Sequence, residues 1–338
     1  VPDKIVTLIK CLYTKFECSV LLDNKETEWF AVDSGVRQGC IISPILFLVA
    51  IDWVMRKTTS DEKRGITWYM FTTLEDLDFA DDIALLSSRH DHMQEKTNRL
   101  SHFASQTGLQ LNTQKTEEMR LNTSSQRKLE VDGNEIQKVD KFIYLGTVIS
   151  TKDSTQKDIK NRLAKARTSF QKLRNIWRSK QYSRKTKIKL YNSNVKPVLL
   201  YGSECWRVTK ADMRALSSFH HSCLRQICRI FWPNTISNTN LLKMTESSCI
   251  IDEITQKRFR WLGHVLRKEN SSITKTALRW TPQGKRPRGR PKTTWRRTIE
   301  NELKDLKMTW GEAETMAKNR TRVARTCVDL MLRSEQRG

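Results

Sequence analysis

Two adjacent aspartates, Asp81 and Asp82, lie inside a strand–turn–strand pattern that runs from Leu74 to Leu86. Adjacent like charges repel and aspartate is depleted in strands, so the pair is costly as a purely structural element. Carboxylates of this kind hold Mg²⁺ in two-metal phosphoryl and nucleotidyl transfer, where the ions activate the attacking oxygen and stabilise the leaving oxygen. The pair therefore predicts a divalent-cation site or, taken alone, a solvated hairpin turn.

The elements around this pair predict an α+β fold. Apolar spacing and capping signals indicate helices, and polar turns between β-rich runs indicate hairpins. Ser43 and Pro44 supply an N-cap and a first-turn proline for one helix, and Gly108 supplies a C-cap for another. In chain order we predict a helix over residues 2–12, a hairpin over 17–33, a loop over 35–40, a helix over 43–53, the carboxylate hairpin over 74–86, a helix over 91–107, a hairpin over 129–139 and a buried strand over 142–149.

Four segments within about 110 residues carry a family resemblance. They are Gly35–Phe47 (GVRQGCIISPILF), Phe79–Asp82 (FADD), Gly108–Lys115 (GLQLNTQK) and Phe142–Gly146 (FIYLG). In this order and spacing they resemble palm motifs of reverse transcriptases, and FADD is similar to the motif of the LINE-like, non-LTR retrotransposon branch. The resemblance implies an RNA-directed DNA polymerase in which Asp81 and Asp82 hold Mg²⁺ or Mn²⁺.

The same resemblance implies roles for other matching residues. Gln38 and Gly39 would line the nucleotide and template side, where a backbone without a Cβ can approach a base pair closely. Arg37 would hold that loop or a phosphate. Lys115 would stand near the pyrophosphate leaving group as a charge stabiliser or proton donor. A surface charge at the end of a strand is an equal alternative for Lys115.

The fourth segment would form the primer-grip hairpin, with Tyr144, Leu145 and Gly146 at its centre. Tyr144 and Leu145 are apolar enough that we expect them in the core in either case.

The family also uses a further metal-binding aspartate on a strand that precedes the first helix and hairpin found here, and this sequence begins after that point. Asp76 and Asp78 are poor substitutes because they lie on the same strand as Asp81. We therefore expect a fragment of the enzyme that is inactive by itself. The alternative is a catalytically inactive, nucleic-acid-binding remnant.

Charge is distributed unevenly along the 338 residues, whose formal net charge is +24. Residues 1–140 carry 17 basic and 22 acidic side chains, whereas residues 141–338 carry 44 basic and 15 acidic ones. A polyanionic partner for the second half is the leading explanation.

A basic, amphipathic helical pattern runs from Lys157 to Leu190 and contains one acidic residue, Asp158. Its position resembles the helical thumb of a polymerase, which follows a duplex through phosphate contacts. The expected contacts are Lys165, Arg167, Lys172 and Arg174. A solvated charged face is the alternative, and membrane-surface binding fits less well.

A second basic stretch, residues 282–294, is expected to be an exposed linker. Arg288 and Arg290 lie in an RGRP sequence that resembles an AT-hook, which reads the narrow minor groove of A·T-rich DNA. Contact with any polyanion is an equal alternative. Helical patterns flank the linker, and the one that starts at Trp295 is expected to be the final helix.

These patterns predict a partial palm with an antiparallel sheet over residues 1–150, an all-helical thumb-like region over 151–235 and a basic helical region over 236–338. The expected partners are an RNA template with a DNA primer, and dNTP. The longest apolar stretch has about 15 residues, short of the roughly 20 that span a bilayer, so no membrane is expected. The eight cysteines match no standard zinc spacing, which makes zinc improbable, and we expect reduced thiols in an intracellular protein of the cytoplasm or nucleus.

Overall fold

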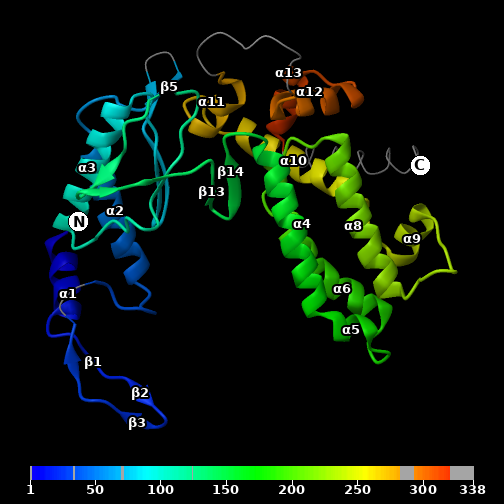
Figure 1. Ribbon diagram of the computed structural model, residues 1–338, viewed down its shortest axis with the longest axis horizontal. Helices are drawn as coiled ribbons and strands as arrows, with labels where there is room; N and C mark the ends of the chain where they lie inside the picture. The colour runs from blue at the N-terminus through cyan, green and yellow to red at the C-terminus, as the bar shows by residue number, and fades with distance from the viewer. Residues whose placement is uncertain (1, 33–34, 70–71, 124, 282–292, 320–338) are drawn as a thin grey trace. The chain divides into compact units, whose positions relative to one another are not determined.

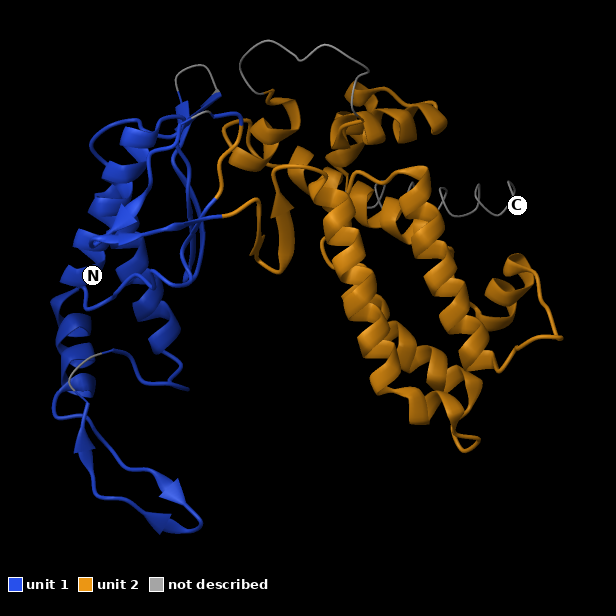
Figure 2. Ribbon diagram, in the orientation of Figure 1, with its two compact units in different colours: residues 1–118, 122–138 blue, residues 119–121, 139–338 orange. Residues whose placement is uncertain are grey.

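The computed structural model describes residues 2–32, 35–69, 72–123, 125–281 and 293–319 (Figure 1). The chain divides into two compact units (Figure 2). Unit 1 comprises residues 1–118 and 122–138, and unit 2 comprises residues 119–121 and 139–338. The range 1–150 expected for the palm therefore includes one hairpin, residues 141–150, that belongs to unit 2.

Unit 1 combines three helices with short strands. Its elements are α1 (Asp3–Tyr13), β1 (Glu17–Cys18), β2 (Leu21–Leu22), β3 (Lys25–Glu26), β4 (Phe30–Ala31), α2 (Ser43–Thr59), β5 (Ile66–Tyr69), β6 (Thr72–Leu74), β7 (Asp76–Phe79), β8 (Asp82–Leu85), α3 (His90–Gln106), β9 (Glu117–Glu118), β10 (Glu130–Val131), β11 (Asn134–Glu135) and β12 (Gln137–Lys138). Within the described residues the strands pair only two by two, and β9–β12 is the one parallel pair. The expected antiparallel sheet is thus present as separate two-stranded ladders.

The core of unit 1 lies between α2 and α3. Ile51, Val54 and Met55 of α2 pack against Leu100 and Ala104 of α3. Leu100 and Ala104 follow the i, i+4 spacing of one helix face.

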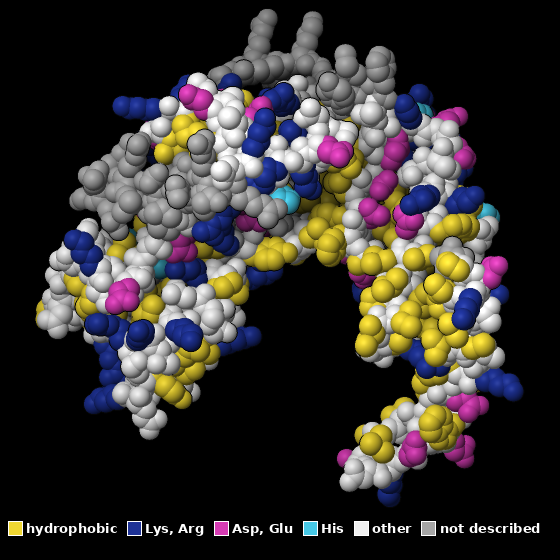
Figure 3. Space-filling model, turned by 180° about the vertical axis from the view of Figure 1, so that it is seen from behind, with side chains coloured by type: hydrophobic (Ala, Val, Ile, Leu, Met, Phe, Trp, Pro, Cys, Tyr) yellow, Lys and Arg dark blue, Asp and Glu magenta, His cyan; other side chains and the backbone are white. Residues whose placement is uncertain are grey.

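Apolar side chains remain exposed on the outer part of unit 1. Helix α1 buries no residue, and Ile45, Leu48 and Val49 of α2 are exposed. Figure 3 shows hydrophobic side chains gathered over this part of the chain.

Unit 2 consists of one hairpin followed by helices. Its elements are β13 (Lys141–Tyr144), β14 (Thr147–Ser150), α4 (Ser154–Lys172), α5 (Arg174–Arg178), α6 (Arg184–Asn194), α7 (Lys196–Leu199), the 3₁₀ turn η1 (Ser203–Cys205), α8 (Lys210–Cys228), α9 (Asn238–Thr245), α10 (Ile250–Leu266), α11 (Ile273–Arg279), α12 (Trp295–Asp305) and α13 (Trp310–Ala317). Its first core joins α4, α6 and α8 with the start of α10, and a second core joins the rest of α10 with α11, α12 and α13. Among the described residues, no helix is long and apolar enough to span a membrane.

The basic stretch over 157–190 is not one helix but α4, α5 and α6. The chain leaves helical geometry at Leu173, which lets Trp177 stack on Phe170 with ring centroids 5.1 Å apart. The Trp177 indole donates a hydrogen bond to the Phe170 carbonyl oxygen at 2.8 Å. Folding back in this way brings the apolar faces of α4 and α6 into one core.

Helix α13 follows the helix that was expected to be the last. Thr309 and Glu312 form a capping box at its start, and Ala313 and Ala317 are buried. The Thr-x-x-Glu signal was readable from the sequence.

A buried histidine in unit 2 predicts a pH dependence of stability. His220 has no exposed surface, and its Nδ1 lies 2.8 Å from the Tyr191 hydroxyl oxygen. Burial, with a smaller contribution from the Lys196 charge, lowers the pKa of His220 from 6.5 to about 3. Below pH 6.5 the His220 ring is therefore protonated in the unfolded chain but stays neutral in the folded chain. The free energy of unfolding consequently falls as the pH drops. Between pH 7 and pH 5 we expect a loss of roughly 2 kcal/mol in the free energy of unfolding, measured with urea.

The control is His220→Gln, which keeps a hydrogen-bonding group toward Tyr191 but cannot titrate. This variant should lose at least half of the pH dependence; His221, whose pKa burial also lowers, accounts for part of the remainder. An unchanged pH dependence in the variant would contradict this assignment.

Candidate metal site and nucleic-acid interface

The carboxylate pair lies at the tip of the β7–β8 hairpin, as expected. Asp76 pairs with Leu85 and Phe79 with Asp82, which leaves Ala80 and Asp81 as the two turn residues. Ala80 has a φ of 56°, the left-handed geometry of a tight turn. Asp81 and Asp82 are both exposed, and within the described part of the chain neither carboxylate has a hydrogen bond or ion pair. Both are therefore available to a ligand.

The two faces of the hairpin differ in character. Cross-strand partners share a face, so Asp76 and Asp78 lie with Leu85 and Ile83, both of which pack on the α2–α3 core. Burial, followed by the nearby Asp78 charge, raises the pKa of Asp76. Asp82 lies on the opposite face, so Asp76 and Asp78 do not join it.

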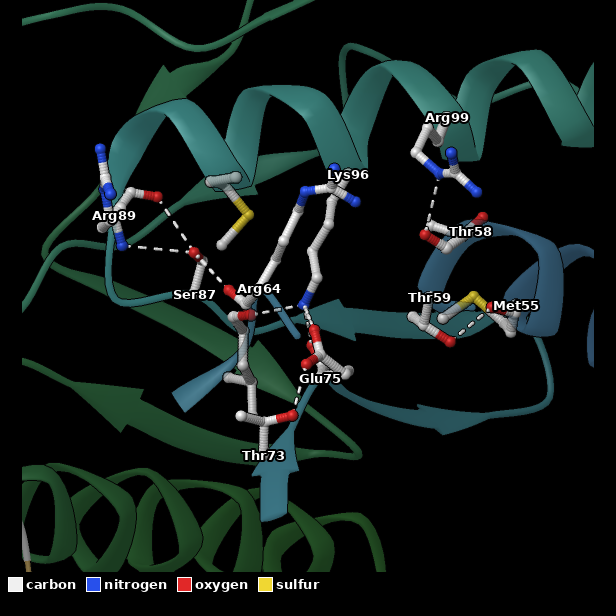
Figure 4. Close-up of polar contacts among 12 residues, drawn as sticks. Met55, Thr58, Thr59, Arg64, Thr73, Glu75, Ser87, Arg89, Lys96 and Arg99 are labelled. Carbon is white, nitrogen blue, oxygen red and sulfur yellow. Dashed lines mark hydrogen bonds and ion pairs between the residues drawn. The ribbon is translucent and has the colours of Figure 1, made fainter. Parts of the chain in front are cut away.

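A buried lysine closes the other end of this hairpin (Figure 4). The Lys96 ammonium donates hydrogen bonds to the carbonyl oxygens of Glu75 at 2.9 Å and Leu86 at 2.8 Å, just outside the two strands. It also forms an ion pair with the Glu75 carboxylate, whose Oε1 accepts a hydrogen bond from Thr73 at 2.7 Å. Desolvation opposes ionisation of Glu75, but hydrogen bonds from Lys96, Thr73 and Gly65 together lower its pKa.

Gly65 allows the close approach at this point. A Cβ on it would lie 2.1 Å from the Leu74 carbonyl oxygen, so no other residue fits without moving the backbone.

Three of the predicted motifs converge on one end of unit 1. Arg99 contacts the Thr58 carbonyl oxygen while Trp53 packs on Phe103, so α2 and α3 run antiparallel. Lys96 binds the end of the β7–β8 hairpin opposite its turn, close to the last residues of α2. From there β7 and β8 extend along the α2–α3 core toward the turn. The Asp81 turn consequently points toward the end where α2 begins and α3 finishes. The loop over 35–42 and the start of the segment over 109–116 lie at that same end.

The loop before α2 is fixed by Arg37 rather than by a helix cap. The Arg37 guanidinium lies 4.1 Å from the centroid of the Phe16 ring and donates a hydrogen bond to the Leu12 carbonyl oxygen. Ser43 is the first residue of α2, not its N-cap, and its hydroxyl donates to the Arg37 carbonyl oxygen at 2.6 Å. Ile42 occupies the N-cap position and no side chain caps the helix N–H groups, so the expected cap is wrong.

Gln38 and Gly39 are exposed at the tip of this loop. Gly39 has a φ of 82°, and a Cβ built on it would meet no atom within 4 Å. The backbone there is open to a bound molecule, whereas Arg37 already has partners within the protein.

Lys115 is exposed in a turn, where its backbone N–H donates to the Asn112 carbonyl oxygen at 3.1 Å. Leu109 and Leu111, just before it, pack on the α2–α3 core. The Lys115 side chain forms no hydrogen bond or ion pair with Asp81 or Asp82, so its role stays a prediction.

The FIYLG segment forms a hairpin, as the resemblance implied, and not the single buried strand over 142–149. Leu145 and Gly146 form its turn with φ angles of 48° and 75°. Leu145 is 38% exposed, so the expectation that it lies in the core is wrong; Tyr144 is half-buried. Side chains of other segments donate hydrogen bonds to the carbonyl oxygens of this turn, so the turn is fixed without burial of its own side chains.

Side chains from distant segments of unit 2 hold this turn. Arg162 donates to the Gly146 carbonyl oxygen, and its guanidinium lies 4.3 Å from the Tyr201 ring centroid. The Tyr201 hydroxyl donates to the Leu145 carbonyl oxygen at 3.0 Å. Asp158 accepts hydrogen bonds from the Val148 backbone N–H at 3.1 Å and from the Trp206 indole at 2.8 Å. The hairpin is thereby fixed to α4.

Sequence reasoning missed Lys96, Arg162 and Asp158 as positioning residues. For Asp158 a signal existed, because it is the one acidic residue in an otherwise basic stretch. No comparable signal marks Lys96 or Arg162, whose burial depends on the tertiary fold.

The four basic residues expected to contact nucleic acid are all exposed along α4 and the start of α5: Lys165, Arg167, Lys172 and Arg174. The buried face of α4 carries Ile159, Leu163, Ala166 and Phe170. Within the described residues, the side chains of these four basic residues form no hydrogen bond or salt bridge. Arg288 and Arg290 fall outside the described residues.

The carboxylate pair fits a magnesium ion by its chemistry. Mg²⁺ prefers oxygen ligands and is usually held by one or two carboxylates together with substrate phosphates and waters. Asp81 and Asp82 provide two exposed carboxylates without protein partners. Across the described ranges no group of three or more His, Cys, Asp or Glu side chains gathers to form a fuller ligand set, and all seven described cysteines are free.

Comparisons with known proteins agree with the motif assignment. Residues 2–149 match the family described as reverse transcriptase (RNA-dependent DNA polymerase), and residues 169–201 match a family of unknown function. An uncharacterised transposon-derived protein of Caenorhabditis elegans is 26% identical over 239 residues, which cover 68% of this chain and 85% of that protein. The retrovirus-related Pol polyprotein from the type-1 retrotransposable element R2 of Popillia japonica is 26% identical over 159 residues, 44% of this chain and 25% of that protein.

Proposed function

Since residues 2–149 match the reverse transcriptase family and part of the chain is similar to a retrotransposable-element Pol polyprotein, we propose that this chain is the part of an RNA-directed DNA polymerase of a LINE-like retrotransposon that carries the FADD metal site, the primer grip and a thumb. The observation that carries the proposal is the pair of exposed, unpartnered carboxylates at the tip of a clamped hairpin. The open Gly39 loop at the same end of unit 1 supports it.

In the proposed reaction a primer 3′-hydroxyl attacks the α-phosphorus of a dNTP, a new phosphodiester bond forms and pyrophosphate leaves. Asp81 and Asp82 would hold Mg²⁺, which when bound would supply Lewis-acid stabilisation of the attacking and leaving oxygens. Lys115 stabilises the charge on the pyrophosphate or gives it a proton. Gln38 and Gly39 face the new base pair.

The remaining segments position the substrate in this proposal. The turn at Tyr144–Gly146 holds the primer end, and its attachment to Arg162 and Tyr201 keeps it rigid. The exposed basic residues of α4 and α5 contact phosphates of the template–primer duplex. Such contacts do not depend on the base sequence.

The direct test is extension of a DNA primer on an RNA template by the 338-residue chain, with Mg²⁺ and dNTP. Extension that requires Mg²⁺ and an RNA template would support the polymerase proposal. Duplex binding without extension would favour the second candidate, a nucleic-acid-binding protein without polymerase activity, for which the exposed basic face of α4 is the specific observation. Failure of both binding and extension would contradict both candidates.

Salt dependence tests the basic face. We expect glutamine at Lys165, Arg167, Lys172 and Arg174 together to weaken binding of an RNA–DNA duplex. The slope of log K against log salt concentration should become shallower by about 1 for each lost phosphate contact. The measurement is fluorescence anisotropy of a labelled duplex between 50 and 200 mM salt, about the range over which such contacts dominate.

The control replaces four exposed lysines of unit 1 with glutamine, which removes the same number of positive charges as the α4 and α5 substitutions. Glutamine at Lys4, Lys10, Lys15 and Lys25 should leave the slope nearly unchanged. Equal effects of the two sets would mean that only the net charge matters, and would contradict a specific role for α4.

A further inference from the structure

A groove runs along the outer face of α8, on the side away from the core of unit 2. The buried face of α8 carries Leu216, Phe219, His220, Cys223, Leu224 and Ile227. The groove is lined by the residues between these positions, among them Arg214, Ser218, His221 and Arg225, and has a volume of about 700 Å³. Their spacing of three and four places them in one row along the helix.

The lining is basic and rich in hydrogen-bonding groups. Arg214 and Arg225 supply positive charge, three serines supply hydroxyl groups, and none of the described residues that line the groove is acidic. Burial and the Arg225 charge lower the pKa of His221, so its ring is neutral at pH 7 and can hydrogen bond to a sugar or base.

Two exposed aromatic residues form the far end of the groove. Phe231 is 58% exposed and Trp232 is 89% exposed, which is costly for side chains of this size unless they meet a ligand. Arg225 fixes the loop that carries them, because its guanidinium donates to the Ile236 carbonyl oxygen at 3.1 Å and to Asn238 Oδ1 at 2.7 Å. The end of this loop is thus tied to α8, and Trp232 lines the same groove as the basic row.

We propose that this α8 groove binds single-stranded nucleic acid, with phosphates on Arg214 and the serine hydroxyls and one base stacked on Trp232. A basic groove combined with an exposed aromatic platform is how proteins hold single strands without reading their sequence. The inference rests on the proposed function and extends it, since the basic face of α4 is assigned to duplex and the α8 groove to an unpaired strand.

The size of the groove suits a short single strand. From Arg214 to Arg225 the helix rises about 16 Å, at 1.5 Å per residue. At roughly 3.4 Å per stacked nucleotide this length accommodates about four or five nucleotides. The strand would be either the unpaired part of the RNA template or a displaced DNA strand, which share a phosphate backbone and base faces.

The test compares Trp232→Ala and Arg214→Gln with the unaltered 338-residue chain. Fluorescence anisotropy would be measured with a labelled 12-nucleotide RNA, a DNA of the same sequence and an RNA–DNA duplex. Trp232→Ala should weaken single-strand binding about 5- to 150-fold, the effect of losing one base–aromatic stack. Arg214→Gln should make the salt dependence shallower by about 1, and duplex binding should be unchanged in both variants.

Trp29→Ala provides a matched control, because Trp29 is 63% exposed in unit 1 and lies outside the groove. It should leave single-strand binding unchanged. Stronger binding of RNA than of DNA would identify the template as the occupant, and the reverse would identify a displaced strand.

Two outcomes would overturn the inference. Normal single-strand binding by Trp232→Ala, with duplex binding intact, would refute the groove while leaving the proposed function in place. Competition by a ten-residue polyglutamate peptide as effective as the RNA would show a site for acidic peptides instead. Loss of duplex binding only in the fourfold glutamine variant of α4 and α5 would bear on the proposed duplex contact and would leave the α8 groove untouched.

Discussion

Replacing Asp81 with alanine is expected to reduce any primer extension that the chain performs on an RNA template by at least about a thousandfold, and such extension would overturn the expectation that the fragment is inactive by itself. Metal-ion stabilisation of the reacting oxygens contributes several kcal/mol, and each 1.4 kcal/mol corresponds to a factor of ten in rate. Asp81 is an exposed turn residue, so its loss should leave the fold and its thermal stability unchanged. The measurement is single-turnover extension at saturating Mg²⁺ and dNTP.

Asp78→Ala is the matched control, because it removes a carboxylate from the same hairpin on the face opposite Asp82. Its activity should remain within a few-fold of that of the unaltered chain. Persistent extension by Asp81→Ala, or an equal loss in Asp78→Ala, would show that the Asp81–Asp82 pair is not the metal site.

Replacing Lys96 with methionine is expected to destabilise unit 1 by about 3–5 kcal/mol. The ammonium is 1% exposed, and its loss would leave the Glu75 carboxylate without its charged partner and take one hydrogen bond from each of the Glu75 and Leu86 carbonyl oxygens. Methionine has a similar length, so lost packing contributes little. Urea unfolding followed by circular dichroism would measure the change in free energy.

Two further variants distinguish loss of the Lys96–Glu75 ion pair from the effect of replacing any lysine with methionine. Lys57→Met removes an exposed lysine from α2 and should change stability by less than about 0.5 kcal/mol. Adding Glu75→Leu to Lys96→Met should recover part of the loss, since an unpaired buried charge is removed. A stability change in Lys96→Met no larger than in Lys57→Met would mean that the hairpin does not depend on this ion pair.

The pH dependence of the same pair has a definite sign. The pKa of Glu75 is lowered in the folded chain, so its ion pair stabilises unit 1 above the ordinary pKa of 4.5. That contribution is lost as the pH falls through the folded value. In Lys96→Met this acid-dependent loss should be smaller.

Much of unit 1 could be predicted because its signals are local. The FADD hairpin has apolar strands on both sides of a polar turn, and α3 shows helical spacing that ends at Gly108. The same holds for α8, whose apolar positions repeat along one face. Such patterns record which residues must be buried together within one element, and this requirement does not depend on the neighbouring elements.

Predictions failed where a specific side-chain contact, rather than the spacing of apolar residues, decides the local structure. The FIYLG segment reads as one apolar strand, but Arg162 and Tyr201 bind the carbonyl oxygens of Gly146 and Leu145 and stabilise a turn there. The stretch over 157–190 reads as one basic helix, but the stacking of Trp177 on Phe170 folds it back on itself. Neither interaction is visible in the spacing of residues.

The sequence by itself determined the chemistry of this protein: an Asp–Asp pair at a hairpin turn, the order of the four motifs, and a basic half joined to a weakly acidic one. These properties depend on residue types and their spacing. Only the tertiary structure decided which charged residues are buried, since Lys96 and Asp158 are ordinary polar residues until packing removes them from water and supplies their partners. It also decided that the row from Arg214 to Arg225 and Trp232 form one groove, because the Arg225 hydrogen bonds place the loop that carries the indole.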